Sequence, residues 1–159
     1  GDAREAVRAT YYPPLGERSW EPLTPMWDGY APDAERANAQ VQCAVMIETA
    51  GALDAVEQIA ALDGVNLLFL GPVDLSLSLG LGLDALLADD SPDGPVGRIL
   101  AAARRHDIEV AAFAGDPSRV PALRALGIDR IAVATDIALV ALGARAVLDL
   151  TEDTYPRSP

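Results

Sequence analysis

The chain has 159 residues, of which half are hydrophobic and 23% are charged. This balance is typical of a globular chain with a real apolar core and excludes a disordered tail. Acidic residues outnumber basic ones 24 to 12, giving a net charge of -12. Since nucleic acids and anionic membrane surfaces repel such a chain, we expect neither as a partner.

Cys43 is the single cysteine, so an internal disulfide cannot form, which suits a reducing compartment. No stretch reaches the ~18 uninterrupted apolar residues of a membrane span. The first residues also lack the basic-then-apolar pattern of a signal peptide. We therefore expect a cytoplasmic protein, with Cys43 as a small core residue.

The first 40 residues predict a helix followed by a proline-rich arm. Alanines and Val7 alternate with charges over residues 1–10, which favours a short helix. Prolines at 13, 14, 22, 25 and 32 argue against regular structure between residues 11 and 32. Asp33 is predicted to cap a second helix over residues 33–40.

From residue 41 onward, apolar runs alternate with helical patterns. Four apolar runs separated by helices indicate a parallel sheet. We predict strands at 41–47, 65–70, 109–113 and 130–134. We predict helices at 50–62, after Gly71, at 96–105, from 117 to 126 and at 137–148; residues 81–96, rich in Asp, Pro and Gly, are predicted to be a loop.

An acidic residue follows each of the first two strands. Glu48 comes directly after the first, and Asp74 lies in the Gly71-Pro72-Val73-Asp74-Leu75-Ser76 segment after the second. The carboxyl ends of adjacent parallel strands are where α/β folds build their sites. With no basic residue close to either acid in the sequence, the pair suggests a hard divalent cation. The alternative is that each acid only caps the following helix.

Several segments in order resemble the HpcH/HpaI family of class II pyruvate aldolases. The strongest are Met46-Ile47-Glu48-Thr49, Leu62-Asp63-Gly64-Val65 and GPVDLSLSLG from Gly71 to Gly80. Residues 7–16 resemble the loop before the family's metal strand, and residues 130–136 resemble its last barrel strand.

The resemblance implies a (β/α)8 barrel, which usually needs about 250 residues. We therefore predict an α/β fold that is a partial TIM barrel, with about four parallel βα units. Residues 1–40 would form the arm, residues 41–150 the second half of the barrel, and residues 151–159 a frayed tail.

The resemblance also implies a carbon-carbon lyase that acts on a small 2-oxo acid such as pyruvate, through an enolate. Glu48 and Asp74 would hold a divalent metal, namely Mg, Mn or Co. Gly71, Pro72 and Val73 would bind the substrate. Phe113 would form a wall of the pocket. All twelve basic residues are arginine, so a Schiff-base lysine is excluded within these residues.

The expected catalytic histidine and arginine of the family come from the first half of the barrel, so we predict no catalytic residue in this chain. His106, the one histidine, is expected on the opposite face from the acids. Ser76 is predicted to serve as a cap or local hydrogen-bonding residue, and Asp136 to cap a helix or support the site rather than to bind the metal. Met46 stands where the family commonly has glutamine.

Two alternatives to an aldolase stay open at this point. One is a degenerate, non-catalytic aldolase-like subunit, and the other is a biosynthetic enzyme that uses an enolate for a different reaction. In each case we expect a homo-oligomer, or a partner that supplies the missing half-barrel, because open sheet edges and apolar faces need to be covered.

Overall fold

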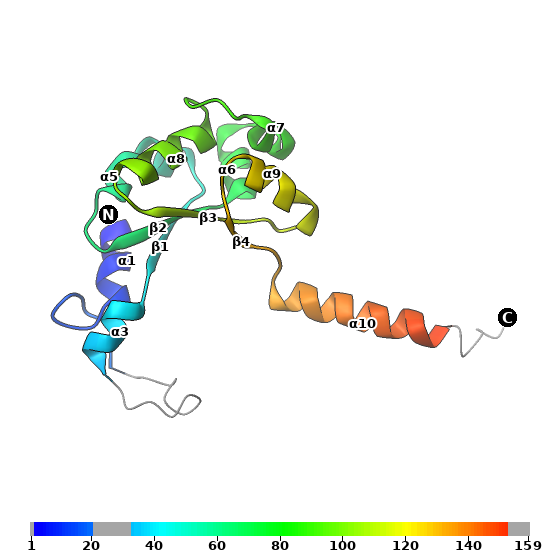
Figure 1. Cartoon of the computed structure of the whole chain (residues 1–159), viewed down its shortest axis with the longest axis horizontal. Helices are drawn as coiled ribbons and strands as arrows, with labels where there is room; N and C mark the ends of the chain where they lie inside the picture. Colours follow the sequence, from blue (N-terminus) through cyan, green and yellow to red (C-terminus); the bar gives the residue numbers. More distant parts are fainter. Residues whose placement is uncertain (1, 21–32, 153–159) are drawn as a thin grey trace.

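The computed structural model describes residues 2–20 and 33–152, which fold around one four-stranded sheet (Figure 1). All three strand pairs are parallel, and the strands lie in the sheet in their order along the chain. The strands are β1 (Cys43–Ile47), β2 (Val65–Leu70), β3 (Glu109–Phe113) and β4 (Arg130–Ala132). The structure thus confirms the predicted parallel sheet.

Helices separate every pair of consecutive strands. Figure 1 shows α5 to α9 on one side of the sheet and α10 extending away from it. Over the described residues the helices are α1 (Asp2–Thr10), α3 (Ala34–Gln40), α4 (Ala50–Asp54), α5 (Val56–Ala60), α6 (Pro72–Leu79), α7 (Leu83–Ala88), α8 (Pro95–Arg105), α9 (Val120–Ala125) and α10 (Asp136–Glu152), with a 3-10 turn at Pro117–Arg119. None of these helices is long and apolar enough to cross a membrane.

The hydrophobic core lies between the sheet and the helices above it. Side chains alternate between the two faces of a strand, and Ile47, Leu68 and Leu70 point into this core and are fully buried. The helices contribute further buried side chains, among them Leu75, Leu86, Ile99 and Leu123. Burial of each such side chain stabilises the fold by about 1.5–3 kcal/mol. This layer therefore holds the helices against the sheet.

The face of the sheet opposite the core is called the inner face here. It carries a polar network at the amino-terminal ends of the strands. Arg130 on β4 pairs with Glu109 on β3, with 2.6 Å between Nη2 and Oε2. The same guanidinium donates from Nη1 to Oε1 of Gln42, just before β1, at 2.7 Å. The sheet is thus curved enough for its two outermost strands to be linked across the inner face.

The predicted loop over residues 81–96 is wrong in its first half, where α7 forms. Leu83, Leu86 and Leu87 stand at helical spacing, and the last two are buried in the core. The chain enters the helix through extended Gly82 and leaves it at Asp89. The Asp, Pro and Gly residues predict a loop correctly only for the segment between α7 and α8.

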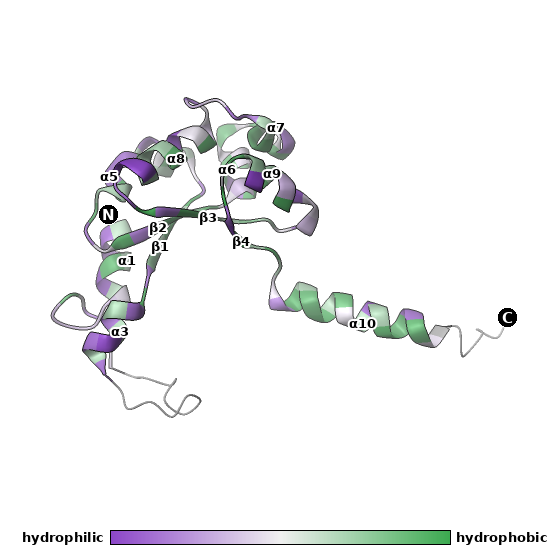
Figure 2. Ribbon diagram, in the orientation of Figure 1, coloured by the Kyte–Doolittle hydropathy of each residue, from purple (hydrophilic) through white to green (hydrophobic). Residues whose placement is uncertain are grey.

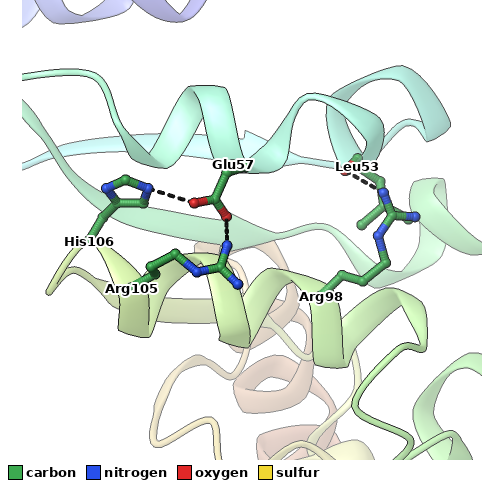
Figure 3. Close-up of polar contacts among 5 residues, drawn as sticks. All are labelled: Leu53, Glu57, Arg98, Arg105 and His106. Atoms are coloured by element: carbon green, nitrogen blue, oxygen red, sulfur yellow. Dashed lines mark hydrogen bonds and ion pairs between the residues drawn. The ribbon is translucent and has the colours of Figure 1, made fainter.

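The predicted helix over residues 50–62 is also wrong in part, because it is broken into α4 and α5 at Ala55. Ala55 is neither glycine nor proline, so composition gives no sign of the break. Nη2 of Arg98 on α8 donates to the carbonyl oxygen of Leu53 at 3.2 Å (Figure 3). A neighbouring helix therefore satisfies a carbonyl at the end of α4.

The amino-terminal arm is attached to the sheet through tyrosine and asparagine side chains. The hydroxyl of Tyr11 lies 2.7 Å from Oδ1 of Asn66, an oxygen that also accepts from the N–H of Cys43. Oδ1 of Asp33 accepts from the N–H of Arg36, which confirms the predicted cap of α3. Pro22, Pro25 and Pro32 of the predicted arm lie outside the described residues.

The last βα unit differs from the prediction at both ends. The fourth strand is shorter, at Arg130–Ala132, and the last helix is longer, reaching Glu152. The start of the predicted frayed tail, at Thr151, is therefore helical, and residues 153–159 lie outside the described part of the chain. Apolar residues recur around α10 (Figure 2).

Candidate metal and substrate site

Glu48 and Asp74 lie at the carboxyl ends of neighbouring parallel strands. Glu48 follows Ile47, the last residue of β1, and Ile47 pairs with Leu70 at the end of β2. Asp74 is the third residue of α6, which begins directly after β2 and Gly71. Both carboxylates thus belong to the same end of the sheet, as the sequence predicted. That they share a cation stays a prediction.

Gly71 brings the two chain segments into close approach. Its N–H donates to the carbonyl oxygen of Ile47 at 3.2 Å, which continues the pairing of β1 and β2 past the end of the strand. A Cβ atom at Gly71 would lie 3.0 Å from Cβ and 3.4 Å from Oε2 of Glu48. Only glycine leaves this space beside the carboxylate open.

The amino terminus of α6 presents backbone N–H groups at the same place. Gly71 is the N-cap and has no side chain to satisfy them, and Pro72 at the first helical position has no N–H. The next amides are those of Val73 and Asp74, in the first turn where no intrahelical partner exists. The helix dipole adds a partial positive charge, so a carboxylate is favoured beside these amides.

Two hydroxyl groups fix α4, which follows Glu48, and α6, which carries Asp74. Oγ of Ser78 on α6 accepts from the N–H of Ala50 on α4 at 2.9 Å, which joins the two βα units. Oγ1 of Thr49 caps α4 by accepting from the N–H of Ala52 at 3.1 Å. Ser78 comes four residues after Asp74, so helical spacing places both on one face of α6. That spacing could have identified Ser78 from the sequence.

The donor set fits a hard divalent cation that keeps open positions. Carboxylate oxygens are the ligands that Mg and Mn prefer, and glycine at position 71 keeps a side chain away from Oε2 of Glu48. Among the described residues, no place gathers three or more His, Cys, Asp or Glu side chains. The pair would therefore leave several coordination positions for water and substrate.

The other predicted residues lie as follows. Phe113 ends β3 and is partly exposed. Ser76 is buried, and its hydroxyl donates to the carbonyl oxygen of Val73 at 2.7 Å, a local role as expected. Oδ1 of Asp136 accepts from the N–H of Ile137 at the start of α10. The side chain that caps α10 is that of Thr135, whose Oγ1 accepts from the N–H of Ala138 at 3.2 Å, so the capping role predicted for Asp136 is wrong.

His106 lies at the other end of the strands. It follows the last residue of α8 and precedes β3, and its Nε2 lies 2.8 Å from Oε1 of Glu57 on α5 (Figure 3). The other carboxylate oxygen of Glu57 accepts from Arg105. The hydrogen bond from Arg105, followed by that from His106, lowers the pKa of Glu57. This cluster links α5 to α8 and is remote from Glu48 and Asp74.

A basic residue that sequence reasoning missed lies near Glu48. Arg4 of α1 lines an open pocket of about 520 Å³ together with Val45, Met46, Glu48 and Gln58. The pocket lies along β1 because α1 packs against that strand. No local pattern could have shown this, since Arg4 and Glu48 are brought together only by the tertiary fold.

Four consecutive parallel βα units with acids at the carboxyl ends of two neighbouring strands define a segment of a (β/α)8 barrel with its site at the usual end. The sequence profile of the HpcH/HpaI aldolase/citrate lyase family matches residues 1–143. The chain therefore belongs to this family.

Named relatives and a solved structure agree with this assignment. The chain is 37% identical to a hydroxypyruvate/pyruvate aldolase of Paraburkholderia phytofirmans over 86% of this chain and 54% of the relative. It is 48% identical to a 4-hydroxy-2-oxovalerate aldolase of Novosphingobium aromaticivorans over 50% of this chain and 30% of the relative. A crystal structure of an HpcH/HpaI aldolase/citrate lyase family protein from Burkholderia cenocepacia superposes with a TM-score of 0.67 at 32% identity, covering 95% of this chain and 60% of that one.

These comparisons also bear on the extent of the fold. The chain spans little more than half the length of the relatives that match most of it. The fold is therefore a partial (β/α)8 barrel, as the sequence predicted.

Proposed function

We propose that this chain carries the metal and 2-oxo acid part of a class II pyruvate aldolase site. Glu48 and Asp74 would hold one divalent cation, Mg, Mn or Co. The observation that supports this most is the close approach of the α6 amino terminus to the Glu48 carboxylate, which the absence of a side chain at Gly71 permits. The named relatives, which include pyruvate aldolases, support the substrate class.

The backbone of the α6 amino terminus would bind the substrate carboxylate. The amides of Val73 and Asp74 are free of intrahelical partners, and Gly71 and Pro72 add no competing donor or acceptor side chain. Phe113, at the end of β3, would form an apolar wall. A cation bound here supplies Lewis-acid stabilisation of the negative charge that a pyruvate enolate carries.

Proton transfer would depend on groups outside this chain. The one histidine, His106, is bound to Glu57 at the far end of the strands, and lysine is absent from the sequence. We therefore propose that residues of this chain bind and orient the 2-oxo acid, and that other polypeptide supplies the acid and base of carbon-carbon cleavage.

Assembly with further polypeptide is part of this proposal. Strands β1 and β4 lie at the two edges of the sheet, and exposed strand edges favour pairing. On α10, seven large apolar side chains are exposed: Ile137, Leu139, Val140, Leu142, Val147, Leu148 and Leu150. A homo-oligomer, or a partner that completes the barrel, would cover these surfaces.

Calorimetric titration with Mn tests the metal site. Asp74→Asn should weaken Mn binding by more than about tenfold, because a ligand charge is lost and even outer-shell changes cost 10–100-fold. His106→Ala serves as control, since His106 lies at the opposite end of the strands, and it should leave the affinity unchanged. Equal losses in both variants, or no Mn binding by the unaltered chain, would contradict the proposed site.

A further inference from the structure

The carboxyl ends of the first three strands lie in one row across the sheet. Three residues that pair with one another across these strands, all buried in the core, are Ile47, Leu70 and Ala112. The residues that follow them along the chain are Glu48, Gly71 and Phe113. Successive side chains of a strand point to opposite faces, so this second row belongs to the inner face. Phe113 therefore adjoins the candidate site from β3.

Arg119 brings a guanidinium group to the same end of the sheet. It is the last residue of the 3-10 turn that follows β3, and its Nη1 donates to the carbonyl oxygen of Ala114 at 3.0 Å. A Cβ atom at Gly115 would lie 3.2 Å from Nη1 of Arg119 and 3.4 Å from Cε1 of Phe113. Both side chains thus pack against this glycine. The guanidinium group is therefore a neighbour of the Phe113 ring.

Arg119 is the one basic residue in the four segments that lead from a strand to the next helix. These segments are residues 48–49, 71, 114–119 and 133–135, all within the described part of the chain. The other charged residues in them are Glu48 and Asp116. A distal anion at this end of the sheet would therefore find one cationic side chain in these segments.

The guanidinium group of Arg119 keeps donors for a ligand. Hydrogen bonds from Ser118, and then the charge of Arg119, lower the pKa of Asp116. The Asp116 carboxylate nevertheless accepts from the N–H of Ser118, at 2.8 Å, and no ion pair joins Arg119 to an acid among the described residues. A guanidinium group carries five N–H donors, of which one hydrogen bond, to Ala114, is seen here. The side chain is partly buried, which strengthens its attraction for an anion.

The position of Arg119 defines what kind of ligand reaches it. In the proposed function, the C1 carboxylate of the substrate binds the amides at the start of α6, directly after β2. Neighbouring strands lie about 4.8 Å apart, so the end of β3 is one strand spacing further along the row. A short carbon chain covers this distance. A second carboxylate at its far end would meet Arg119.

We propose that Arg119 binds a second carboxylate at the distal end of the substrate, so that the site favours 4-hydroxy-2-oxo diacids over acids with an uncharged end. This inference rests on the proposed function, which places the C1 carboxylate and the metal. The planar fork of a guanidinium group matches the two oxygen atoms of a carboxylate. An apolar end of the same shape gains no such pair.

Two ligands of similar shape isolate the distal charge. In 2-oxoglutarate C5 carries two carboxylate oxygens, and in 5-methyl-2-oxohexanoate it carries two methyl groups. Calorimetric titration of the purified chain with saturating Mn should show 2-oxoglutarate binding about tenfold more tightly, as one charged hydrogen-bonded pair allows. Arg119→Gln should reduce this ratio to about one while pyruvate still binds. Arg119→Lys, which keeps the charge, should retain a preference for 2-oxoglutarate.

Arg124→Gln is the matched control, because it removes the same charge from an exposed residue near the other end of α9. It should leave the ratio unchanged. Arg4→Gln tests the basic residue near Glu48 on the β1 side. If Arg4→Gln abolishes the preference and Arg119→Gln does not, the distal carboxylate binds on the β1 side and the role of Arg119 is refuted.

Three further outcomes would also overturn the inference. If pyruvate binds but the unaltered chain shows no preference for 2-oxoglutarate, Arg119 has no such role and the proposed function stands. The same conclusion follows if both Arg119 variants lose pyruvate binding together with 2-oxoglutarate, because Arg119 would then act only through its contact with Ala114. If no 2-oxo acid binds in the presence of Mn, the proposed function fails, and this inference with it.

Discussion

Gly71 shows how one missing side chain shapes the candidate site. Its φ of -97° is open to any residue, so backbone conformation does not require glycine here. The requirement comes from space, because the carboxylate of Glu48 and the sulfur of Met46 both approach the position of the absent Cβ. The missing side chain therefore lets the start of α6 lie close to Glu48 and Met46.

Gly71→Ala should therefore weaken Mn binding while the chain still folds. The added methyl group would push against Glu48, and overpacking of this kind costs about 1–3 kcal/mol. If about 1.4 kcal/mol of this appears in binding, the affinity falls about tenfold. Titration calorimetry and thermal unfolding together would measure both effects.

Gly51→Ala is the comparison for this variant, since a Cβ atom at Gly51 on α4 meets no atom within 4 Å. It should leave Mn affinity unchanged and preserve or raise stability, because alanine favours a helix over glycine. Unchanged Mn affinity in Gly71→Ala would show that the space over Glu48 is not needed.

At the scale of elements, α5 and α8 are held together by a charged cluster as well as by the core. Glu57 on α5 accepts from Arg105 and lies within hydrogen-bonding distance of His106, at the end of α8 (Figure 3). These hydrogen bonds lower the pKa of Glu57 below its ordinary value of 4.5. A lowered pKa in the folded state means that the ionised form stabilises the fold.

This contribution should be present above the ordinary pKa of a glutamate and lost as the pH falls through the lowered value. Thermal unfolding of Glu57→Gln should therefore show a lower midpoint than the unaltered chain at neutral pH, and the two midpoints should converge in acid. Glu35→Gln removes the same charge from exposed α3 and should not reproduce this pattern. Parallel pH profiles for Glu57→Gln and the unaltered chain would contradict the role of the cluster.

The sequence predicted the helices and strands whose residue patterns lie within a short stretch of the chain. Apolar runs located all four strands, and their ends located Glu48 and Asp74. By contrast, α7 was missed because the turn residues after it masked Leu83, Leu86 and Leu87, and the helix break at Ala55, beside which Arg98 of another helix contacts the carbonyl of Leu53, has no local signal. Arg4 reaches the vicinity of Glu48 only through tertiary packing. Local patterns cannot report such contacts.

At the scale of the whole molecule, α10 is the least covered helix in the part of the chain that the structure describes. It is a 17-residue helix that extends from the sheet (Figure 1), and most of its residues are apolar (Figure 2). Contiguous exposed apolar surface of this kind marks an interaction site. It agrees with the proposal that further polypeptide covers the fold.

Purified chain should therefore scatter light as an assembly or, as a monomer, show negligible cleavage of a 4-hydroxy-2-oxo acid. Leu142→Glu on α10 should shift an assembly toward smaller species, since an exposed leucine buried at an interface contributes about 1.5–3 kcal/mol. Leu15→Glu makes the same change at a leucine of similar exposure in the arm, 64% against 61%, and should not shift it. A stable monomer with aldolase activity would refute this prediction.

The strand order of the sheet has a consequence for how the chain folds. Each strand pairs with its successor in the sequence, so every pairing closes a loop that contains only the helices between those two strands, and the entropy lost in closing such a loop grows only slowly with its length. Native structure can then grow one unit at a time, as in repeat proteins where each unit contacts its neighbours. The hydrogen bond between Gln42 and Arg130 is different, because it spans 88 residues. It can form only after all four strands are in place, which makes it a late event in folding rather than a nucleus.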